Sequence, residues 1–248
     1  MSAVDAIGVV IPAHDEEELL GACLDAMEVA VLAARAAGAR VEVVVVLDAC
    51  TDGSAAIAAA HDVTVIEVSA RRVGAARAAG VRKALELLDA GGSSGREHQR
   101  VWTAHTDADS TVPPHWLTHQ LALARGGADV MIGTVRPDFR DLTREQVDAW
   151  WLSHVPGVAN GHVHGANLGV RASTLLAAGG FPPLAAHEDV ALVDMLRRAG
   201  ARLAASDAAW VSTSGRHVSR APEGYARYLR DELPQVERFR RPREISLL

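Results

Sequence analysis

Short runs of apolar residues alternate along this chain with longer segments in which apolar positions return every three or four residues. The runs are typical of buried parallel strands, and the periodic segments are typical of helices with one buried face. The expected strands cover residues 7–11, 41–47, 63–68, 100–105, 128–134 and 165–171. This alternation predicts an α/β fold: a single compact domain in which a mostly parallel sheet is flanked by helices.

Capping and turn residues predict where the helices begin. Asp15 has the character of an N-cap, because Glu18 follows three positions later and an apolar face begins at Leu19. Further helices are expected to begin at Gly53 and at Pro113, and to cover residues 74–88, 141–152, 172–178 and 187–199. Loops are expected over residues 91–99 and 155–164, where the periodicity is lost.

No linker divides the chain, so its two halves are expected to build one site. Residues 1–110 have the features of a nucleotide-binding half, and residues 111–218 are expected to complete the site. Residues 219–248 are expected to form a C-terminal helical tail. The basic segment 238–243 in this tail either is a solvated terminus or contacts an anionic membrane surface.

Length and charge limit the classes of function. The 248 residues are enough to bury a core without disulfides or a structural metal. The formal net charge of −6 argues against nucleic-acid binding, which normally needs a basic face. An anionic ligand would then be held by a metal ion and by local dipoles.

The cysteines and the apolar runs indicate the cellular setting. Cys23 and Cys50 are the only cysteines, and two reduced thiols are typical of a reducing compartment. The N-terminal residues lack the basic region of a signal peptide, and no apolar stretch approaches the ~20 residues of a membrane span. A cytoplasmic protein without an integral membrane segment is expected.

Polar residues cluster after three of the expected strands, at residues 12–16, 48–52 and 106–110. In open α/β sheets the ligand binds at the carboxyl ends of the strands, so these clusters are expected to meet. The alternative for the acidic members is that they cap the following helices, as Asp15 and Asp52 are placed to do.

Two acidic pairs are the main candidates for chemistry. Asp107 and Asp109 directly follow a strand, and their hard oxygens suit Mn²⁺ or Mg²⁺ bridging to a diphosphate. Such an ion neutralises charge on a leaving group. Glu188 and Asp189 open a helix, where a carboxylate stays ionised and can accept a proton from a hydroxyl. Ordinary acidity of a helix N-terminus is the alternative for this second pair.

Several further side chains are candidates for contacts with a second, hydroxyl-bearing substrate, called the acceptor from here on. His162 and His164 immediately precede Gly165 and either position acceptor hydroxyls or are bound by the backbone. Glu188, beside Asp189, either binds an acceptor hydroxyl or is simply an acid at a helix start. Trp150 and Trp151 either stack on a sugar or pack in the core.

Taken together, these segments resemble glycosyltransferase family 2, whose members have the GT-A fold. The resemblance covers about residues 7–215 and depends on the order and spacing of its parts. These are residues 9–16 (VVIPAHDE), 43–54 (VVVVLDACTDGS), 73–80 (VGAARAAG), 106–110 (TDADS), 165–171 (GANLGVR), 179–181 (GGF), 188–189 (ED) and 196–200 (LRRAG).

The resemblance implies an inverting hexosyltransferase-like enzyme that uses Mn²⁺ or Mg²⁺. The donor would be a UDP- or GDP-sugar, and the acceptor a hydroxyl group of unknown origin. Asp189 would be the catalytic base, and residues 111–218 would be the acceptor-side half. The implied donor contacts are Pro12, Ala13, Glu16, Asp48, Arg77 and Asp107; the implied sugar and acceptor contacts are Gly165 and Asn167, beside His164 and Glu188; the implied metal ligands are Asp109, Asp107 and His217.

Some departures and alternatives stay open. The family often has two adjacent acids where this chain has Leu47 and Asp48, and an Asn where it has Ala78, which leaves the nucleotide undecided. Arg216 is an alternative to His217 as a contact of the metal and diphosphate. The rival functions are a non-catalytic domain that binds a nucleotide sugar and, less favoured, a sugar-phosphate nucleotidyltransferase.

Overall fold

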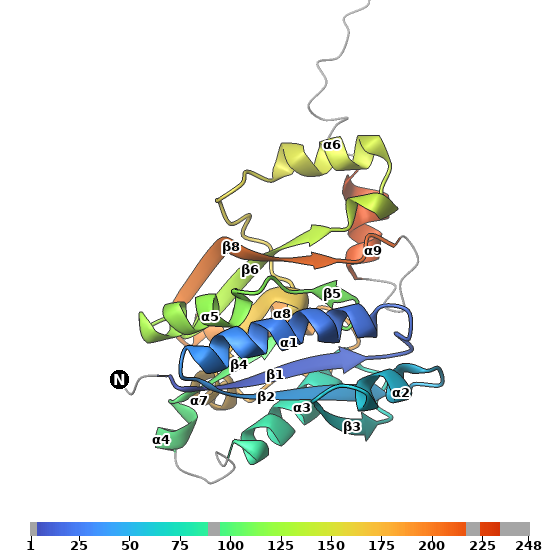
Figure 1. The fold of residues 1–248 in the computed structure, drawn as a ribbon. Helices are drawn as coiled ribbons and strands as arrows, with labels where there is room; N and C mark the ends of the chain where they lie inside the picture. Colours follow the sequence, from blue (N-terminus) through green and yellow to red (C-terminus); the bar gives the residue numbers. More distant parts are fainter. Residues whose placement is uncertain (1–3, 89–94, 217–223, 234–248) are drawn as a thin grey trace, which may run out of the picture.

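The structure, a computed structural model, describes residues 4–88, 95–216 and 224–233 (Figure 1). Its strands are β1 (Ala6–Ala13), β2 (Arg40–Asp48), β3 (Thr64–Val68), β4 (Val101–His105), β5 (Ser110–Thr111), β6 (Val130–Pro137), β7 (Leu168–Arg171) and β8 (Leu203–Thr213). Its α-helices are α1 (Leu20–Ala36), α2 (Ser54–Ala59), α3 (Val73–Leu87), α4 (Gly95–His98), α5 (Trp116–Arg125), α6 (Arg144–Ser153), α7 (Ala172–Ala177), α8 (Glu188–Arg198) and α9 (Tyr225–Arg227). Two short 3-10 helices are η1 (Phe139–Asp141) and η2 (Gly165–Asn167), and a π-helix is η3 (Tyr228–Glu232).

The strands form one eight-stranded sheet in the order β3-β2-β1-β4-β7-β6-β8-β5. Strands β3, β2, β1 and β4 are parallel, and β6 is parallel to β8. Strand β7 runs antiparallel to both β4 and β6, and the short β5 runs antiparallel to β8. The predicted mostly parallel sheet flanked by helices is therefore confirmed, with two reversed strands.

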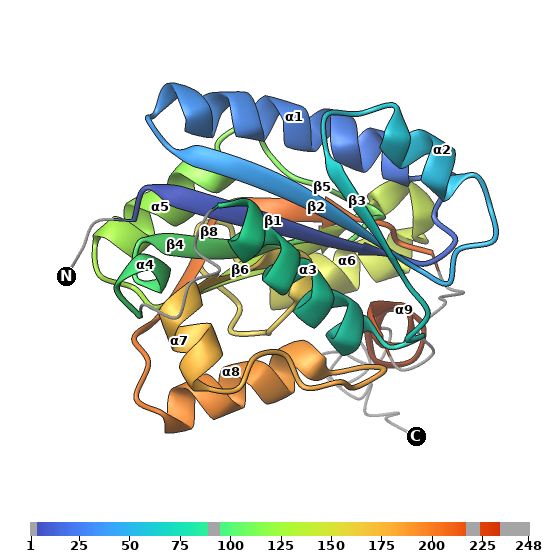
Figure 2. The same cartoon turned by 90° about the horizontal axis from the view of Figure 1, so that it is seen from below.

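Alternate residues of β1 face two different cores. Ile7, Val9 and Ile11 pack with α1 and α5, whereas Ala6 and Val10 pack with α3. Figure 2 shows α1 and α2 on one side of the sheet and α3, α7 and α8 on the other. A Cβ at Gly8 would lie 2.8 Å from the Cβ of Ala84, so this glycine lets α3 approach the sheet closely.

A third, smaller core lies outside the main sheet. Ala149 and Trp150 of α6 pack against Leu229 and Leu233 from the C-terminal part of the chain. In Figure 1, α6 lies beyond β6 and β8, away from β1 and β2. Of the helical tail expected over residues 219–248, the structure describes residues 224–233, where α9 and η3 lie.

Two expected boundaries were wrong near the first helix and the predicted 91–99 loop. Helix α1 begins at Leu20 rather than next to Asp15, whose φ of 53° and bond from the Thr51 amide place it in a loop. The carboxylate is thus used by a neighbouring loop, which competes with capping. Within the segment expected to be a loop, residues 95–98 form the short helix α4.

Three later boundaries also moved. The helix expected from Pro113 begins at Trp116. The helix expected over 141–152 begins at Arg144, because Thr143 and Gln146 form a reciprocal capping box. The strand expected over 165–171 begins at Leu168, and the three residues before it form η2.

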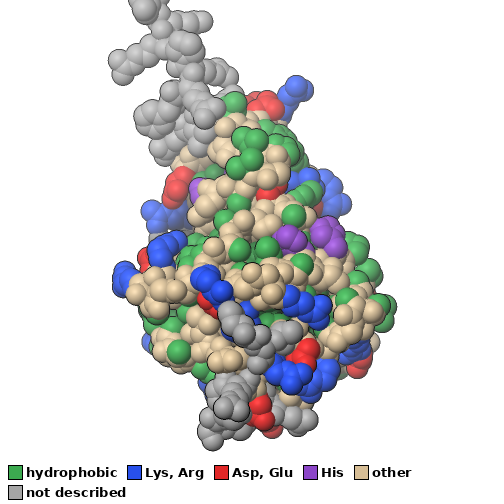
Figure 3. Space-filling view, turned by 90° about the vertical axis from the view of Figure 1, so that its left-hand side faces the viewer, with side chains coloured by type: hydrophobic (Ala, Val, Ile, Leu, Met, Phe, Trp, Pro, Cys, Tyr) green, Lys and Arg blue, Asp and Glu red, His purple; other side chains and the backbone are tan. Residues whose placement is uncertain are grey.

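One face of the molecule has a mixture of side-chain types. Basic side chains are scattered among apolar and acidic ones over the described part of the face in Figure 3, the face nearest the N-terminal end of the sheet. None of the helices in the described ranges combines the length and apolarity that a membrane span requires.

Candidate functional site

A cavity of about 830 Å³ opens where the carboxyl ends of β1, β2 and β4 meet the start of α8. The loop after β8 and the α9–η3 segment close its other sides. Most of the predicted site residues line it, from both halves of the chain: Pro12, Ala13, Glu16, Asp48, Arg77, Asp107, Asp109, His164, Gly165, Glu188 and Asp189. The strand-end clusters therefore do meet in one place.

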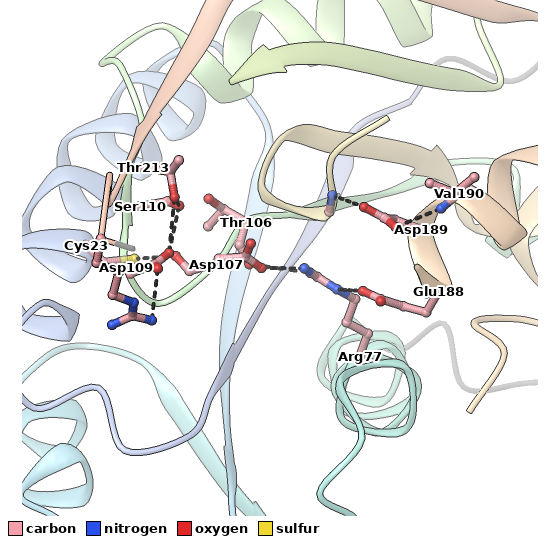
Figure 4. A network of polar contacts seen from close by, with 12 residues as sticks. Cys23, Arg77, Thr106, Asp107, Asp109, Ser110, Glu188, Asp189, Val190 and Thr213 are labelled. Carbon is pink, nitrogen blue, oxygen red and sulfur yellow. Dashed lines mark hydrogen bonds and ion pairs between the residues drawn. The ribbon is translucent and has the colours of Figure 1, made fainter. Parts of the chain in front are cut away.

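Arg77 of α3 joins two carboxylates on one side of the cavity (Figure 4). Its Nη2 lies 2.5 Å from Oδ1 of Asp107, and its Nε donates to Oε1 of Glu188 at 3.0 Å. The guanidinium is only 1% exposed, and the charges of Asp107 and Glu188 help to raise its pKa against the opposing effect of burial. A single buried, permanently charged guanidinium thereby pairs with both carboxylates, so its one positive charge offsets only part of their combined negative charge.

Gly165 makes room for this arginine. A Cβ at position 165 would lie 2.5 Å from Nη2 of Arg77, so a side chain there would displace the guanidinium. The sequence pointed to Gly165 as a neighbour of the sugar, and the structure gives it a contact with Arg77 as well.

Asp109 lies on the other side of Asp107, between β5 and β8. Its Oδ1 accepts from the hydroxyls of Ser110 and Thr213, both at 3.2 Å. Its Oδ2 lies 3.1 Å from Nη2 of Arg216, which also binds Glu16 through two contacts of 2.9 and 2.5 Å. The two acids of the Asp-x-Asp motif are thus divided between two arginines.

The environment of Asp109 fits a hard divalent cation. Burial, followed by the charge of Asp107, raises the pKa of Asp109 to about 6, although the charge of Arg216 opposes this. A carboxylate held in this way has negative charge that its neighbours neutralise only in part, and oxygen ligands of this type bind Mn²⁺ or Mg²⁺. Asp109, with Asp107 beside it, would hold such an ion.

A different acidic group lies near the start of the chain. Potential ligand atoms of Asp15, Cys50 and Asp52 lie within 4.8 Å of one another. Both carboxylates already accept backbone N–H groups, Asp15 from Thr51 and Asp52 from Glu17 and Ser54. These bonds account for the cluster as loop structure, as expected for acids near a helix start.

Asp189 is held by backbone donors at the start of α8. Its Oδ2 accepts from the Gly165 amide at 2.6 Å, and its Oδ1 accepts from the Val190 amide at 2.8 Å (Figure 4). His187, the residue directly before α8, has a φ of 59°, so the backbone turns sharply before the helix. A carboxylate oriented by two N–H groups retains lone pairs that can accept a hydroxyl proton.

Aromatic and imidazole rings form the wall next to Asp189. His164 meets the edge of Tyr225 at 5.4 Å between centroids, and Tyr225 stacks on Tyr228 at 5.6 Å. Burial lowers the pKa of His164 to about 4, so its imidazole is neutral at neutral pH. Sequence reasoning missed both tyrosines, although their spacing of three residues in an expected helix places them on one face.

Asp48 has a structural partner that the sequence did not predict. Its two oxygens accept from the backbone amides of Arg71 and Arg72, at 2.8 and 3.0 Å. These bonds fix the turn before α3, where Arg71 has a φ of 48°. Arg71 and Arg72 line the cavity and are two functional candidates that sequence reasoning missed.

One predicted residue, Asn167, does not line the cavity. The side chain of Asn167 is fully buried, accepts from Nε1 of Trp116 and donates to the carbonyls of Thr134 and Ala209. These bonds tie η2 to α5, β6 and β8, so the amide is used in contacts within the protein. His217 lies outside the described residues, whereas its neighbour Arg216 lies in the cavity wall.

Comparison with known proteins identifies a sequence family for this chain. The sequence matches the family described as glycosyl transferase family 2 over residues 8–176, which is more than half of the chain. A search of curated proteins gives no match.

Solved structures share the fold at low sequence identity. The mannosyltransferase PcManGT from Pyrobaculum calidifontis, in complex with GDP-Man and Mn²⁺, has a TM-score of 0.59 and 21% identity over 93% of this chain and 61% of that one. Residues 1–349 of S. aureus TarS give a TM-score of 0.57 and 15% identity over 86% and 61%. Glucosyl-3-phosphoglycerate synthase from Mycobacterium tuberculosis, with Mn²⁺, UDP and phosphoglyceric acid, gives 0.52 and 18% over 86% and 72%. The chain thus spans about three fifths of the first two.

Proposed function

The chain belongs to glycosyl transferase family 2, and on this premise we propose that it is a metal-dependent, inverting glycosyltransferase. The donor is a nucleotide diphosphate sugar, with UDP or GDP as the nucleotide, and the acceptor is a hydroxyl group. The observation that supports this most strongly is that one cavity is lined by Asp107 and Asp109 after β4 and by Asp189 at the start of α8. Further support comes from PcManGT, whose structure contains GDP-Man and Mn²⁺.

Asp189 acts as the general base. Its backbone bonds from Gly165 and Val190 fix the carboxylate, so one oxygen can accept the proton of an acceptor hydroxyl. The acceptor oxygen then attacks the anomeric carbon as the bond to the diphosphate breaks. Attack from the face opposite the leaving group inverts the anomeric configuration.

The donor lies along the carboxyl edge of the parallel strands. Pro12, Ala13 and the turn held by Asp48 line the nucleoside end of the cavity, where Arg71 and Arg72 are also found. Asp109 and Asp107 hold the divalent cation, which would neutralise the charge that develops on the departing diphosphate. His164, Tyr225 and Tyr228 line the acceptor side.

Substitution of Asp189 tests the base. In Asp189→Asn, the amide cannot accept the proton, so turnover should fall by about 10²–10⁴-fold while nucleotide affinity is retained. Release of UDP or GDP is measured with a panel of UDP- and GDP-sugars and polyol or sugar acceptors. Asp194→Asn, on the same helix but paired with Arg197, serves as the matched control and should keep its turnover. Equal turnover in Asp189→Asn and the wild type would remove Asp189 from this role.

The same assay tests the finer parts of the proposal. Chelation should abolish transfer, and added Mn²⁺ or Mg²⁺ should restore it, because Asp109 requires a cation to bind the diphosphate. The anomeric configuration of the product, measured by NMR, should be opposite to that of the donor. A product with the donor's configuration would contradict the single displacement.

A further inference from the structure

Arg216 follows β8 and is tied to the backbone around Asp109. Strand β8 pairs with β5 through Thr213 and Ser110, and the Ser214 amide donates to the Asp109 carbonyl at 3.1 Å. The backbone that leads to Arg216 is therefore held close to Asp109, which keeps the guanidinium near the Asp109 carboxylate. Its side chain is 28% exposed, whereas that of Arg77 is 1% exposed, although both line the cavity.

The two acidic contacts of Arg216 are unequal. It binds both oxygens of Glu16 through separate nitrogens, a bidentate geometry that holds the guanidinium firmly. It reaches Asp109 only through Nη2, at 3.1 Å from Oδ2. The contact with Asp109 is thus the weaker one, and it can break while Glu16 still holds the arginine.

A divalent cation on Oδ2 of Asp109 is incompatible with this contact. Mn²⁺ or Mg²⁺ binds a carboxylate oxygen at about 2.0–2.2 Å, and a guanidinium nitrogen at hydrogen-bond distance from the same oxygen would repel it. Binding of the cation therefore requires Arg216 to leave Asp109. A diphosphate, which has oxygens that match the guanidinium fork, would give Arg216 a new partner.

We propose that Arg216 is an internal cation that competes with the divalent metal for Asp109 and that moves from Asp109 to the donor diphosphate when both ligands bind. This inference rests on the proposed function. In the unliganded enzyme the arginine opposes binding of the metal alone. Metal and nucleotide diphosphate then bind cooperatively, because each removes a cost of binding the other.

Mn²⁺ titrations test this competition directly. The affinity for Mn²⁺ is measured by electron paramagnetic resonance with and without UDP or GDP, for the wild type and for Arg216→Gln. Without nucleotide, Arg216→Gln should bind Mn²⁺ at least about fivefold more tightly than the wild type. The factor by which UDP or GDP increases Mn²⁺ affinity should be smaller in the variant by a similar ratio.

Two further variants control for charge and folding. Arg197→Gln removes a surface arginine that pairs with Asp194, and it should leave Mn²⁺ affinity unchanged. Arg216→Lys keeps the charge but cannot bind both oxygens of Glu16 through a planar fork. Its Mn²⁺ affinity should therefore lie between that of the wild type and that of Arg216→Gln. If Arg216→Gln does not fold, the comparison of Arg216→Lys with the wild type decides the question.

The outcomes separate this inference from the proposed function. If Mn²⁺ and nucleotide bind but the Arg216 variants have wild-type Mn²⁺ affinity or weaker, the competition does not exist and the metal-dependent function stands. If no variant binds Mn²⁺ even with UDP or GDP, both the metal-dependent function and the competition are overturned.

Discussion

Two arginines determine the charge of the site at the scale of single residues. Arg77 pairs with Asp107 and Glu188 from inside the protein, and Arg216 contacts Asp109 and Glu16 from the cavity wall. Carboxylates gathered this closely would otherwise repel one another. The sequence suggested a donor contact for each arginine but did not reveal these pairings, because the partners lie 30 to 200 positions apart.

Substitution of Gly165 tests the position of Arg77. In Gly165→Ala, the new methyl group would lie 2.5 Å from Nη2 of Arg77, so the guanidinium must shift away from Asp107 or Glu188. Overpacking of this type costs about 1–3 kcal/mol of unfolding free energy, and transfer should slow as well. Urea unfolding measures the stability, and nucleotide release measures the activity.

Gly21 provides the control, since a Cβ there meets only Ile57 at an ordinary 3.8 Å. Gly21→Ala lies inside α1 and should stabilise the protein by about 0.5–1 kcal/mol. If Gly165→Ala is as stable and as active as Gly21→Ala, Gly165 is not needed to accommodate Arg77.

At the scale of elements, the strands and most helices were predicted because their apolar patterns reflect burial directly. Within strand β2, residues 43–47 are an unbroken apolar run and are buried on both faces of the sheet. The start of α1 was predicted wrongly because the Asp15 carboxylate accepts from the distant Thr51 amide, and no local pattern records such a bond. Asn167 is a similar case: the family resemblance implied a place beside the sugar, but the three partners of its side chain belong to α5, β6 and β8, which no local pattern reveals.

The small core of α6, α9 and η3 should open independently of the main sheet. Leu229 is fully buried there, and its carbonyl accepts from Nε2 of Gln146. Leu229→Ala should therefore loosen residues 225–233 and α6 by about 2–5 kcal/mol, without changing β1 and β2. Hydrogen exchange measured by mass spectrometry resolves these segments.

The half-exposed Leu176 of α7 serves as the comparison, and Leu176→Ala should leave exchange unchanged. Faster exchange in β1 and β2 of Leu229→Ala, equal to that in residues 225–233, would mean that the protein opens as one cooperative unit.

At the scale of the whole molecule, one sheet brings together residues from both halves of the chain. The parallel strands β1, β2 and β4 end at the cavity, as the sequence predicted. The position of β7 between β4 and β6 was not predictable, because strand order depends on pairing between distant segments rather than on local pattern. The wall formed by His164, Tyr225 and Tyr228 was missed because residues 164 and 225 are far apart in the sequence and meet only in the fold.

Neutral His164 should make the folded protein sensitive to acid. The pKa of His164 is about 4 when folded and about 6.5 when unfolded, so between these values the unfolded chain binds more protons. Stability therefore falls as the pH drops from 6.5 towards 4, by up to about 2 kcal/mol at pH 5. His164→Gln should lose less stability than the wild type between pH 7.5 and pH 5, as measured by urea unfolding.

His61 gives a control of opposite sign. Its hydrogen bond to the Ile57 carbonyl, with a further contribution from Asp25, raises its pKa, so protonation stabilises the folded state in acid. His61→Gln should lose more stability than the wild type on acidification. Parallel pH profiles for His164→Gln and the wild type would contradict a neutral His164.

The reversed direction of β7 has a consequence for how acceptor choice can change. Because β7 runs away from the cavity, the turn η2 that precedes it supplies the Gly165 amide that binds Asp189, while Arg171 at the far end of β7 is anchored to Asp129 and to the carbonyls of Ala124 and Ala128. Residues 154–164 therefore connect two fixed points, α6 and η2. If Asp189 is the base, as we propose, insertions or exchanges in this connection would reshape the acceptor side of the cavity without moving Asp189, so acceptor choice could change while the proposed transfer chemistry is preserved.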